Sequence, residues 1–301
     1  MMLQNSSPNR IKRSSPKQLF PYGGGKAILA KRIVQIINEH EWNQYVEPFA
    51  GGASVFWQIK AEGRHERKGF VLNDINSLIV TAYRVAIAQP EELYLKLKSS
   101  LYSQRLHRLS KQIINDPDGY CDIEIAWAVI YNIRTSYMNQ LTGSWSRDSG
   151  ANNWSRNYAK VYSYFLDYLP EVLSLLETAI ISNEDAITCI DKTDGSDTIF
   201  YCDPPYPNTE GFHYSGYTQS DFERLIDRLA TTQGTVVLSC YPNDAVPKDW
   251  IKYEFPRNCF MAKKSGITSE RMECVWVKPK HQKTIFCHKQ SVKNQLSLFN
   301  F

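Results

Sequence analysis

The stretch TIFYCDPPY, residues 198–206, predicts a buried strand that ends at a rigid turn. Its first five residues are β-branched, aromatic or small, as in a strand buried on both faces. The prolines after Asp203 lack N–H donors, fix their own φ, and hold the residue before each in an extended conformation. The turn therefore offers two acceptors, the Asp203 carboxylate and the Pro204 carbonyl, beside the flat ring of Tyr206.

A paired acceptor next to an aromatic face suits a planar amino group with two N–H donors, such as the exocyclic amine of a nucleobase. The alternative is an ordinary strand-to-loop turn, because Asp and Pro also favour turns that carry no function. The choice between the two depends on the other motifs of the chain.

Length and composition describe a soluble globular protein. The chain has 301 residues, 43% hydrophobic and 22% charged, enough for one large domain or two ordinary ones. No apolar run reaches the ~18 residues of a membrane span, and the polar, basic residues 1–17 do not form a secretory signal. Seven cysteines, an odd count without a C-x-x-C pair, predict reduced thiols in a cytosol and no structural zinc site.

The distribution of charge is more informative than the net charge of +4. Basic residues alternate with aromatic, Asn, Ser and Gly residues between residues 134 and 160. That mixture is typical of a surface for phosphates and bases rather than of a hydrophobic core. Any single basic cluster is more often a solvated face than a binding site.

Alternating strands and helices predict an α/β fold with a Rossmann-like, mostly parallel sheet and helices on both faces. Helical spacing occurs over about residues 27–39 and 54–60. Strands are predicted at residues 45–47, 70–72, 179–181, 199–202, 236–239 and 272–277. Between about residues 84 and 170 the alternation stops, which predicts a mainly helical insertion with a long polar loop.

A glycine-rich turn, PFAGGA at residues 48–53, follows the first predicted strand and opens a helix. Asp74 ends the next strand, at roughly the 20-residue spacing at which a carboxylate can hold ribose hydroxyls. The absence of G-x-G-x-x-G argues against a dehydrogenase, and residues 23–26 do not complete a P-loop. A tight turn without a ligand is the alternative.

Four motifs follow one another in the order PYGGGK at residues 21–26, VEPFAGGAS at 46–54, LNDIN at 72–76 and DPPY at 203–206. This series resembles the Dam-type adenine-specific DNA methyltransferases, the alpha group of S-adenosylmethionine-dependent amino methyltransferases. The resemblance implies a discontinuous methyltransferase domain, a target-recognition insertion and a C-terminal tail. These span residues 17–84 with 171–280, residues 85–170, and residues 281–301, respectively.

The resemblance also implies the cofactor S-adenosylmethionine and a set of residues that bind it. The set consists of Tyr22, Lys26, Glu47, Phe49, Gly51, Asp74, Asp185 and Asp203. Within it, Asp74 corresponds to the acid that binds the ribose and Asp185 to an acid near the adenine of the cofactor. Asp203 would contact both the cofactor and the target.

The predicted catalytic residues are Asp203, Pro204 and Tyr206. The exocyclic nitrogen of adenine is a poor nucleophile, because its lone pair is delocalised into the ring. Hydrogen bonds from that nitrogen to Asp203 and the Pro204 carbonyl should localise the lone pair and stabilise the developing positive charge. The base must leave the duplex, with Tyr206 as its stacking surface and Tyr214 and Tyr217 as further candidates to line the pocket. No metal is needed for this chemistry.

The insertion supplies the predicted DNA contacts, which are Arg134, Arg147, Asn152, Asn153 and Arg156. Arg and Asn side chains can read guanine and adenine edges in the major groove, and the same residues can instead contact phosphates. The insertion lacks the stretch associated with GATC recognition in the Dam enzymes, so no recognition sequence is predicted.

The end of the chain, QLSLF at residues 295–299, resembles the peptide by which bacterial replication and repair proteins dock on the sliding clamp. Two leucines and a phenylalanine would enter a preformed apolar groove on that partner. The residues concerned are Gln295, Leu296, Leu298 and Phe299. The alternative is a terminal helix that packs on its own domain.

Three functions are compatible with these patterns. The preferred one is a cytoplasmic, nucleoid-associated methyltransferase of a bacterium or phage that acts on adenine in double-stranded DNA. A second is a methyltransferase that acts on the amino group of cytosine or on RNA. Asp rather than Ser before Pro-Pro-Tyr favours adenine over cytosine. The third is a DNA-binding module with a vestigial cofactor fold, which the intact set Lys26, Asp74 and Asp203 disfavours.

Overall fold

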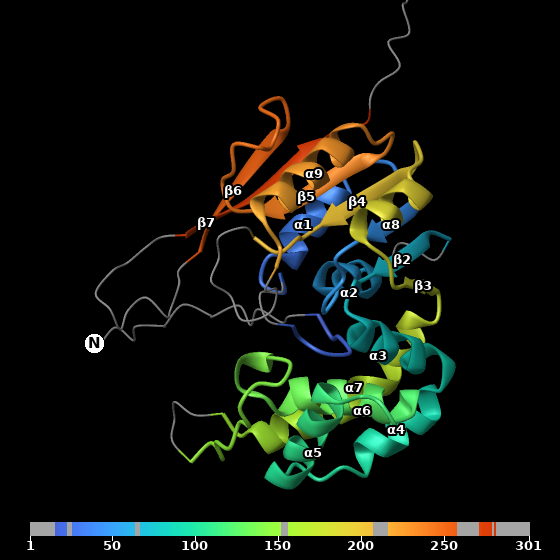
Figure 1. The fold of residues 1–301 in the computed structure, drawn as a ribbon, viewed down its shortest axis with the longest axis vertical. Helices are drawn as coiled ribbons and strands as arrows, with labels where there is room; N and C mark the ends of the chain where they lie inside the picture. Colours follow the sequence, from blue (N-terminus) through green and yellow to red (C-terminus); the bar gives the residue numbers. More distant parts are fainter. Residues whose placement is uncertain are drawn as a thin grey trace, which may run out of the picture.

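A seven-stranded sheet in the order β3-β2-β1-β4-β5-β7-β6 forms the centre of the computed structural model (Figure 1). The strands are β1 (Gln44–Glu47), β2 (Gly69–Asn73), β3 (Ala179–Ser182), β4 (Thr198–Cys202), β5 (Thr235–Cys240), β6 (Ile251–Arg257) and β7 (Arg271–Lys278). The structure describes residues 16–22, 26–63, 67–151, 156–206, 216–257, 271–278 and 280.

The first five strands are parallel, which confirms the predicted mostly parallel sheet. Strand β7 is antiparallel both to β5 and to β6. The predicted strands omit β6, because it lies at the edge of the sheet and exposes Ile251, Lys252 and Glu254. A strand with so few buried side chains lacks the apolar run that marks the central strands.

Helices cover both faces of the sheet, as predicted. They are α1 (Ala30–Ile37), α2 (Ser54–Ala61) and α3 (Ser77–Ala88) on one face, and α8 (Ala186–Thr193) and α9 (Gln219–Ala230) on the other. Neighbouring strand residues point to opposite layers: Tyr45 packs with the first group and Val46 with the second. Tyr201 and Phe200 divide in the same way. This alternation follows from the two-residue period of a strand.

The predicted insertion is mainly helical and forms a second body beside the sheet (Figure 1). It contains α4 (Pro90–Lys98), α5 (Gln104–Asn115), α6 (Asp122–Thr135), the short 3-10 helix η1 (Tyr137–Asn139) and α7 (Tyr158–Leu176). Helix α6 is buried along most of its length and contacts α3, α4, α5 and α7. The expected domain limits after residues 84 and 170 fall inside α3 and α7, so the chain leaves and rejoins the sheet through helices.

A buried polar network fixes the loop that follows α6. His107 lies 2.8 Å from Thr135 Oγ1 through Nδ1 and 3.1 Å from the Gly143 carbonyl through Nε2. Asn132 Oδ1 accepts from the Thr142 N–H at 2.9 Å. Burial lowers the pKa of His107, which favours a neutral ring that bonds through both nitrogens. Side chains of α5 and α6 therefore hold the loop at Thr142 and Gly143 in place.

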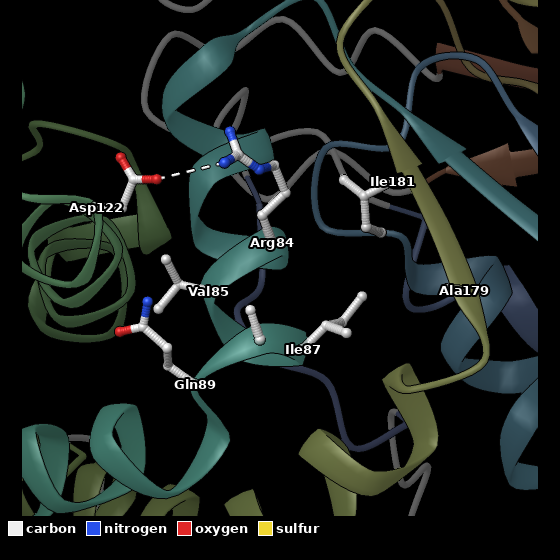
Figure 2. Close-up of a pocket in the computed structure, with 8 residues that line it drawn as sticks. Arg84, Val85, Ile87, Gln89, Asp122, Ala179 and Ile181 are labelled. Atoms are coloured by element: carbon white, nitrogen blue, oxygen red, sulfur yellow. Dashed lines mark hydrogen bonds and ion pairs between the residues drawn. The ribbon is translucent and has the colours of Figure 1, made fainter.

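A pocket of about 350 Å³ lies where the insertion meets β3 (Figure 2). Aliphatic side chains of α3 and β3 line it, and Arg84 Nη2 lies 3.4 Å from Asp122 Oδ2 at its rim. None of its lining residues is a predicted site residue. Within the described ranges, no helix combines the length and apolar character needed to cross a membrane.

Two tyrosines of α7 test this account of the insertion core. Tyr162 is 3% exposed, donates to the Leu97 carbonyl at 2.8 Å and packs edge-on against Tyr131, whereas Tyr164 is 62% exposed. We expect Tyr162→Ala to lower the free energy of unfolding by about 3–5 kcal/mol. The matched variant Tyr164→Ala should cost less than about 1 kcal/mol. Urea unfolding measures both, and equal losses would contradict the assigned packing of α7.

Candidate active site

The candidate site lies at the carboxyl ends of the central strands. Strand β1 pairs with β2 on one side and with β4 on the other, so the order of the chain reverses there. Parallel sheets bind ligands in the crevice at such a reversal point. Glu47 ends β1, Asp74 directly follows β2, and Asp203 directly follows β4.

The glycine-rich turn is clamped from two sides. Asp74 accepts from the Gly51 N–H through Oδ2 at 2.8 Å and from the Asn76 N–H through Oδ1 at 2.9 Å. A Cβ on Gly52 would lie 3.0 Å from the Phe20 carbonyl oxygen and 3.0 Å from the Tyr22 Cβ. The turn therefore leaves little room for a side chain at Gly52, and it brings Tyr22, Gly51 and Asp74 together.

Lys26 and Tyr206 converge on the Asp203 carboxylate. The Lys26 ammonium lies 2.7 Å from Oδ1 and 2.9 Å from Oδ2, and the Tyr206 hydroxyl lies 3.3 Å from Oδ1. Lys26 Nζ also lies 4.9 Å from the centre of the Tyr206 ring, which meets Tyr241 edge-on at 4.5 Å. The prolines of the turn and these two donors fix the position of the carboxylate.

The site contains several carboxyl groups that are shielded from water. Burial raises the pKa of Asp203, an effect that the Lys26 ammonium opposes. It also raises the pKa of Asp74, and that of Glu47 well above its ordinary value. A cation brought to these carboxyl groups would favour their ionised forms. Their chemistry therefore fits a ligand that carries a positive charge.

An aromatic pair lies beside this acidic region. The Phe49 and Tyr217 rings meet edge-on at 6.4 Å, and the buried Tyr217 hydroxyl has no hydrogen-bond partner among the described residues. Asp185 is exposed at the start of α8, where its Oδ1 accepts from the Ile187 N–H at 2.9 Å. A buried hydroxyl beside apolar rings can bond to the polar edge of a ligand.

Glu273 is a member of the site that the predicted residues omit. It is fully buried on β7, accepts from the Tyr206 hydroxyl, and lies 3.4 Å from Lys26 Nζ. It reaches the carboxyl end of β4 because β7 runs antiparallel to its neighbours. The available signal is a lone acid within the apolar run at residues 272–277, since a buried charge needs a partner.

The family model for D12 class N6 adenine-specific DNA methyltransferases matches residues 22–259. The chain belongs to this family. It is a DNA methyltransferase that uses S-adenosylmethionine to methylate the exocyclic amino group of adenine. The match confirms the resemblance drawn from the four motifs, and the acid-rich site fits a cofactor that carries a sulfonium charge.

Two relatives of the methyltransferase are type II methyltransferases. M1.LlaDCHI of Lactococcus lactis subsp. cremoris is 25% identical over 221 residues, 66% of this chain and 69% of that protein. M.CviBI of Paramecium bursaria Chlorella virus NC1A is 23% identical over 224 residues, 74% of this chain and 82% of that protein. Among solved structures, the rRNA methyltransferase AviRa of Streptomyces viridochromogenes is 11% identical at a TM-score of 0.41, with 83% and 84% of the two chains covered.

The structure places the predicted DNA contacts of the methyltransferase in two different settings. Arg134 Nε donates to the Leu19 carbonyl at 3.2 Å, Nη2 donates to the Gln18 carbonyl, and the guanidinium lies 4.0 Å from the centre of the Phe165 ring. These contacts conflict with a DNA role for Arg134, because the side chain ties the N-terminal segment to the insertion. Arg147 and Arg156 are exposed.

The other predicted residues fall on parts of the chain that are not described. Asn152 and Asn153 lie outside the described residues, as do Tyr214 and the four tail residues Gln295, Leu296, Leu298 and Phe299. Their roles stay predictions from the sequence.

Three arginine variants separate the two settings. Arg147→Ala and Arg156→Ala should weaken DNA binding and reduce the slope of log Kd against log salt by about one unit each, as expected for phosphate contacts. Arg134→Met should leave that slope unchanged and lower stability by on the order of 2 kcal/mol, because hydrogen bonds from a half-buried charge are lost. Salt titrations and urea unfolding check both. A reduced slope for Arg134→Met at unchanged stability would restore Arg134 to the DNA contacts.

Proposed function

We propose that Asp203 and the Pro204 carbonyl hold the amino group of an adenine that is flipped out of a short target sequence in duplex DNA. The observation that carries this proposal is the position of Asp203. It lies at the reversal point of the sheet, with Lys26 and Tyr206 at 2.7 and 3.3 Å from its carboxylate. A carboxylate held in this way already stands at its final position when the substrate arrives.

The two acceptors would each take one hydrogen bond from the amino group and localise its lone pair. When bound, S-adenosylmethionine supplies an electrophilic methyl group, which joins the nitrogen lone pair while the carbon–sulfur bond breaks and leaves its electron pair on sulfur. The positive charge that develops on the nitrogen is stabilised by Asp203. One proton then leaves that nitrogen for the Asp203 carboxylate, its nearest acceptor, and passes on to water.

We assign the cofactor to the carboxyl ends of β1 to β4. The Gly51 turn and Asp74 would hold its ribose and methionine parts, helped by Tyr22, Lys26 and Glu47. Phe49 and Tyr217 would pack against its adenine, with Asp185 nearby. The buried Tyr217 hydroxyl, which has no partner among the residues that the structure describes, and the close approach of Tyr22 to the turn support this assignment.

Tyr206 is the proposed stacking surface for the flipped base. Its hydroxyl is anchored by Asp203 and Glu273, which would fix the plane of the ring before the base arrives. Residues 85–170 are the proposed target-recognition insertion, with Arg147 and Arg156 as phosphate or base contacts and Asn152 and Asn153 as further candidates. Residues 17–84 and 171–280 form the proposed methyltransferase domain.

The relatives also support a proposal for the cellular setting. Both are type II methyltransferases, which supports a role for this chain as the modification enzyme that protects sites on nucleoid DNA. We propose that it is site-specific and works in the cytoplasm of a bacterium or phage-infected cell.

An adenine-methylation map tests the role of Asp203. DNA from a methylation-free host that expresses the chain should carry N6-methyladenine at one short motif, and Asp203→Ala should lower methylation at least ~100-fold. Asp227→Ala, which removes an exposed carboxylate on α9, is the matched control and should leave the map unchanged. Full methylation by soluble Asp203→Ala would contradict the assignment of Asp203, and methylation at cytosine would contradict the assigned target.

Deleting residues 295–301 tests the proposed contact of the tail with the sliding clamp. Without Gln295, Leu296, Leu298 and Phe299, pull-down by purified clamp should be lost, because the apolar groove on the partner has nothing to bind. Methylation of naked DNA should continue at the full rate. Loss of soluble, folded protein on deletion would instead favour a tail that packs on its own domain.

A further inference from the structure

Glu273 is a buried acid for which the transfer step described above has no use. Its side chain is fully buried on β7, between Met272 and Cys274, where an unpaired carboxylate would cost several kcal/mol. Two contacts offset that cost, because the Tyr206 hydroxyl donates to Oε1 and the Lys26 ammonium lies 3.4 Å from the same oxygen. Glu273 is therefore part of the site.

Lys26 and Tyr206 each touch both carboxylates of the site. Lys26 lies 2.7 Å from Asp203 and 3.4 Å from Glu273, so a small movement of its flexible side chain would exchange one partner for the other. The Tyr206 hydroxyl bonds to Glu273 and lies 3.3 Å from Asp203. Two donors are thus shared between two acceptors, with one carboxylate facing the proposed target and the other enclosed behind it.

The contact of Lys26 with both carboxylates resolves a difficulty in the proposed reaction. Lys26 contacts both oxygens of Asp203, and an ammonium in that position weakens the carboxylate as an acceptor for the amino group of adenine. If Lys26 had no other partner, releasing Asp203 would leave a buried cation unpaired, which is strongly unfavourable. A second carboxylate within reach removes that penalty.

We propose that Glu273 is a positioning residue for methyl transfer: it takes over the Lys26 ammonium and keeps its hydrogen bond from the Tyr206 hydroxyl as the target amino group bonds to Asp203. The inference rests on the proposed role of Asp203. In this arrangement Glu273 touches neither substrate nor cofactor. It keeps the lysine paired and the Tyr206 ring in place while Asp203 exchanges the lysine for the substrate.

Glu273→Gln tests the proposal, because it keeps the shape of the side chain and removes its charge. Single-turnover methylation of unmethylated genomic DNA should slow by about tenfold or more, as expected when a charged hydrogen-bond partner is lost. The Kd for S-adenosylmethionine should change less than about threefold, since Glu273 does not touch the cofactor. Glu254→Gln on the adjacent β6, where the carboxylate is exposed, is the matched control and should keep the full rate.

The pH profile separates positioning from a merely structural role. The charge of Glu273 raises the pKa of Asp203, so removing that charge lowers this pKa. The acid limb of the single-turnover rate should therefore move to lower pH in Glu273→Gln. Burial also raises the pKa of the other groups that face Asp203 and Glu273. Because these groups are the same in both proteins, the acid limb of Glu273→Gln is compared with that of the wild type. These groups are Glu47, Tyr201, Tyr206, Cys202, Cys240 and Cys274.

Each outcome decides the matter. A wild-type rate in folded Glu273→Gln, or a slower rate with an unmoved acid limb, would overturn the proposal. Should Glu273→Gln not fold, Glu273→Asp replaces it: a slower rate at unchanged cofactor Kd supports the role, and a wild-type rate refutes it. Asp203→Ala runs in the same assay. If that variant stays active, the role of Asp203 fails; if it is inactive while Glu273→Gln is normal, only the inference about Glu273 fails.

Discussion

The buried ion pair between Lys26 and Asp203 joins parts of the chain that are 177 positions apart, and the site is organised around it. One partner enters from the segment before α1, the other from the turn after β4. A buried pair of this kind contributes little net stability, because desolvation of both charges offsets their attraction. Its value lies in geometry: it fixes where an acceptor stands before any substrate is present. The parallel strands, the proline turn and the clamped glycine turn all serve to bring these two groups to one point.

The parts of the fold that could be predicted from the sequence are those with a local cause. The β4 run and its proline stop, and the glycine turn with Asp74 after the next strand, each follow from a few consecutive residues. Strand β6 and the place of Glu273 do not, because an antiparallel pairing at the end of the sheet is decided by tertiary contacts. Nothing local in Met272-Glu273-Cys274 indicates that this strand runs against the others.

Arg134 shows a different limit of sequence reasoning. A basic residue in a stretch rich in aromatic and amide side chains has the same composition whether its guanidinium meets a base or a buried ring. Here it lies over Phe165 and holds the backbone of residues 18 and 19. The distinction depends on how α6 packs against α7 and the N-terminal segment, and composition carries no information about that packing.

The way in which the insertion joins the sheet has an evolutionary consequence. The chain departs through α3 and returns through α7 into β3, and these elements pack side by side at one edge of the molecule. The body between them is thus a cassette whose two attachment points already touch. Strand order does not depend on what this body contains, although an exchanged body would have to replace the contact of Arg134 with residues 18 and 19. With residues 85–170 as the proposed target-recognition insertion, a new DNA target could be acquired by exchange of this body while the reacting groups stay with the sheet.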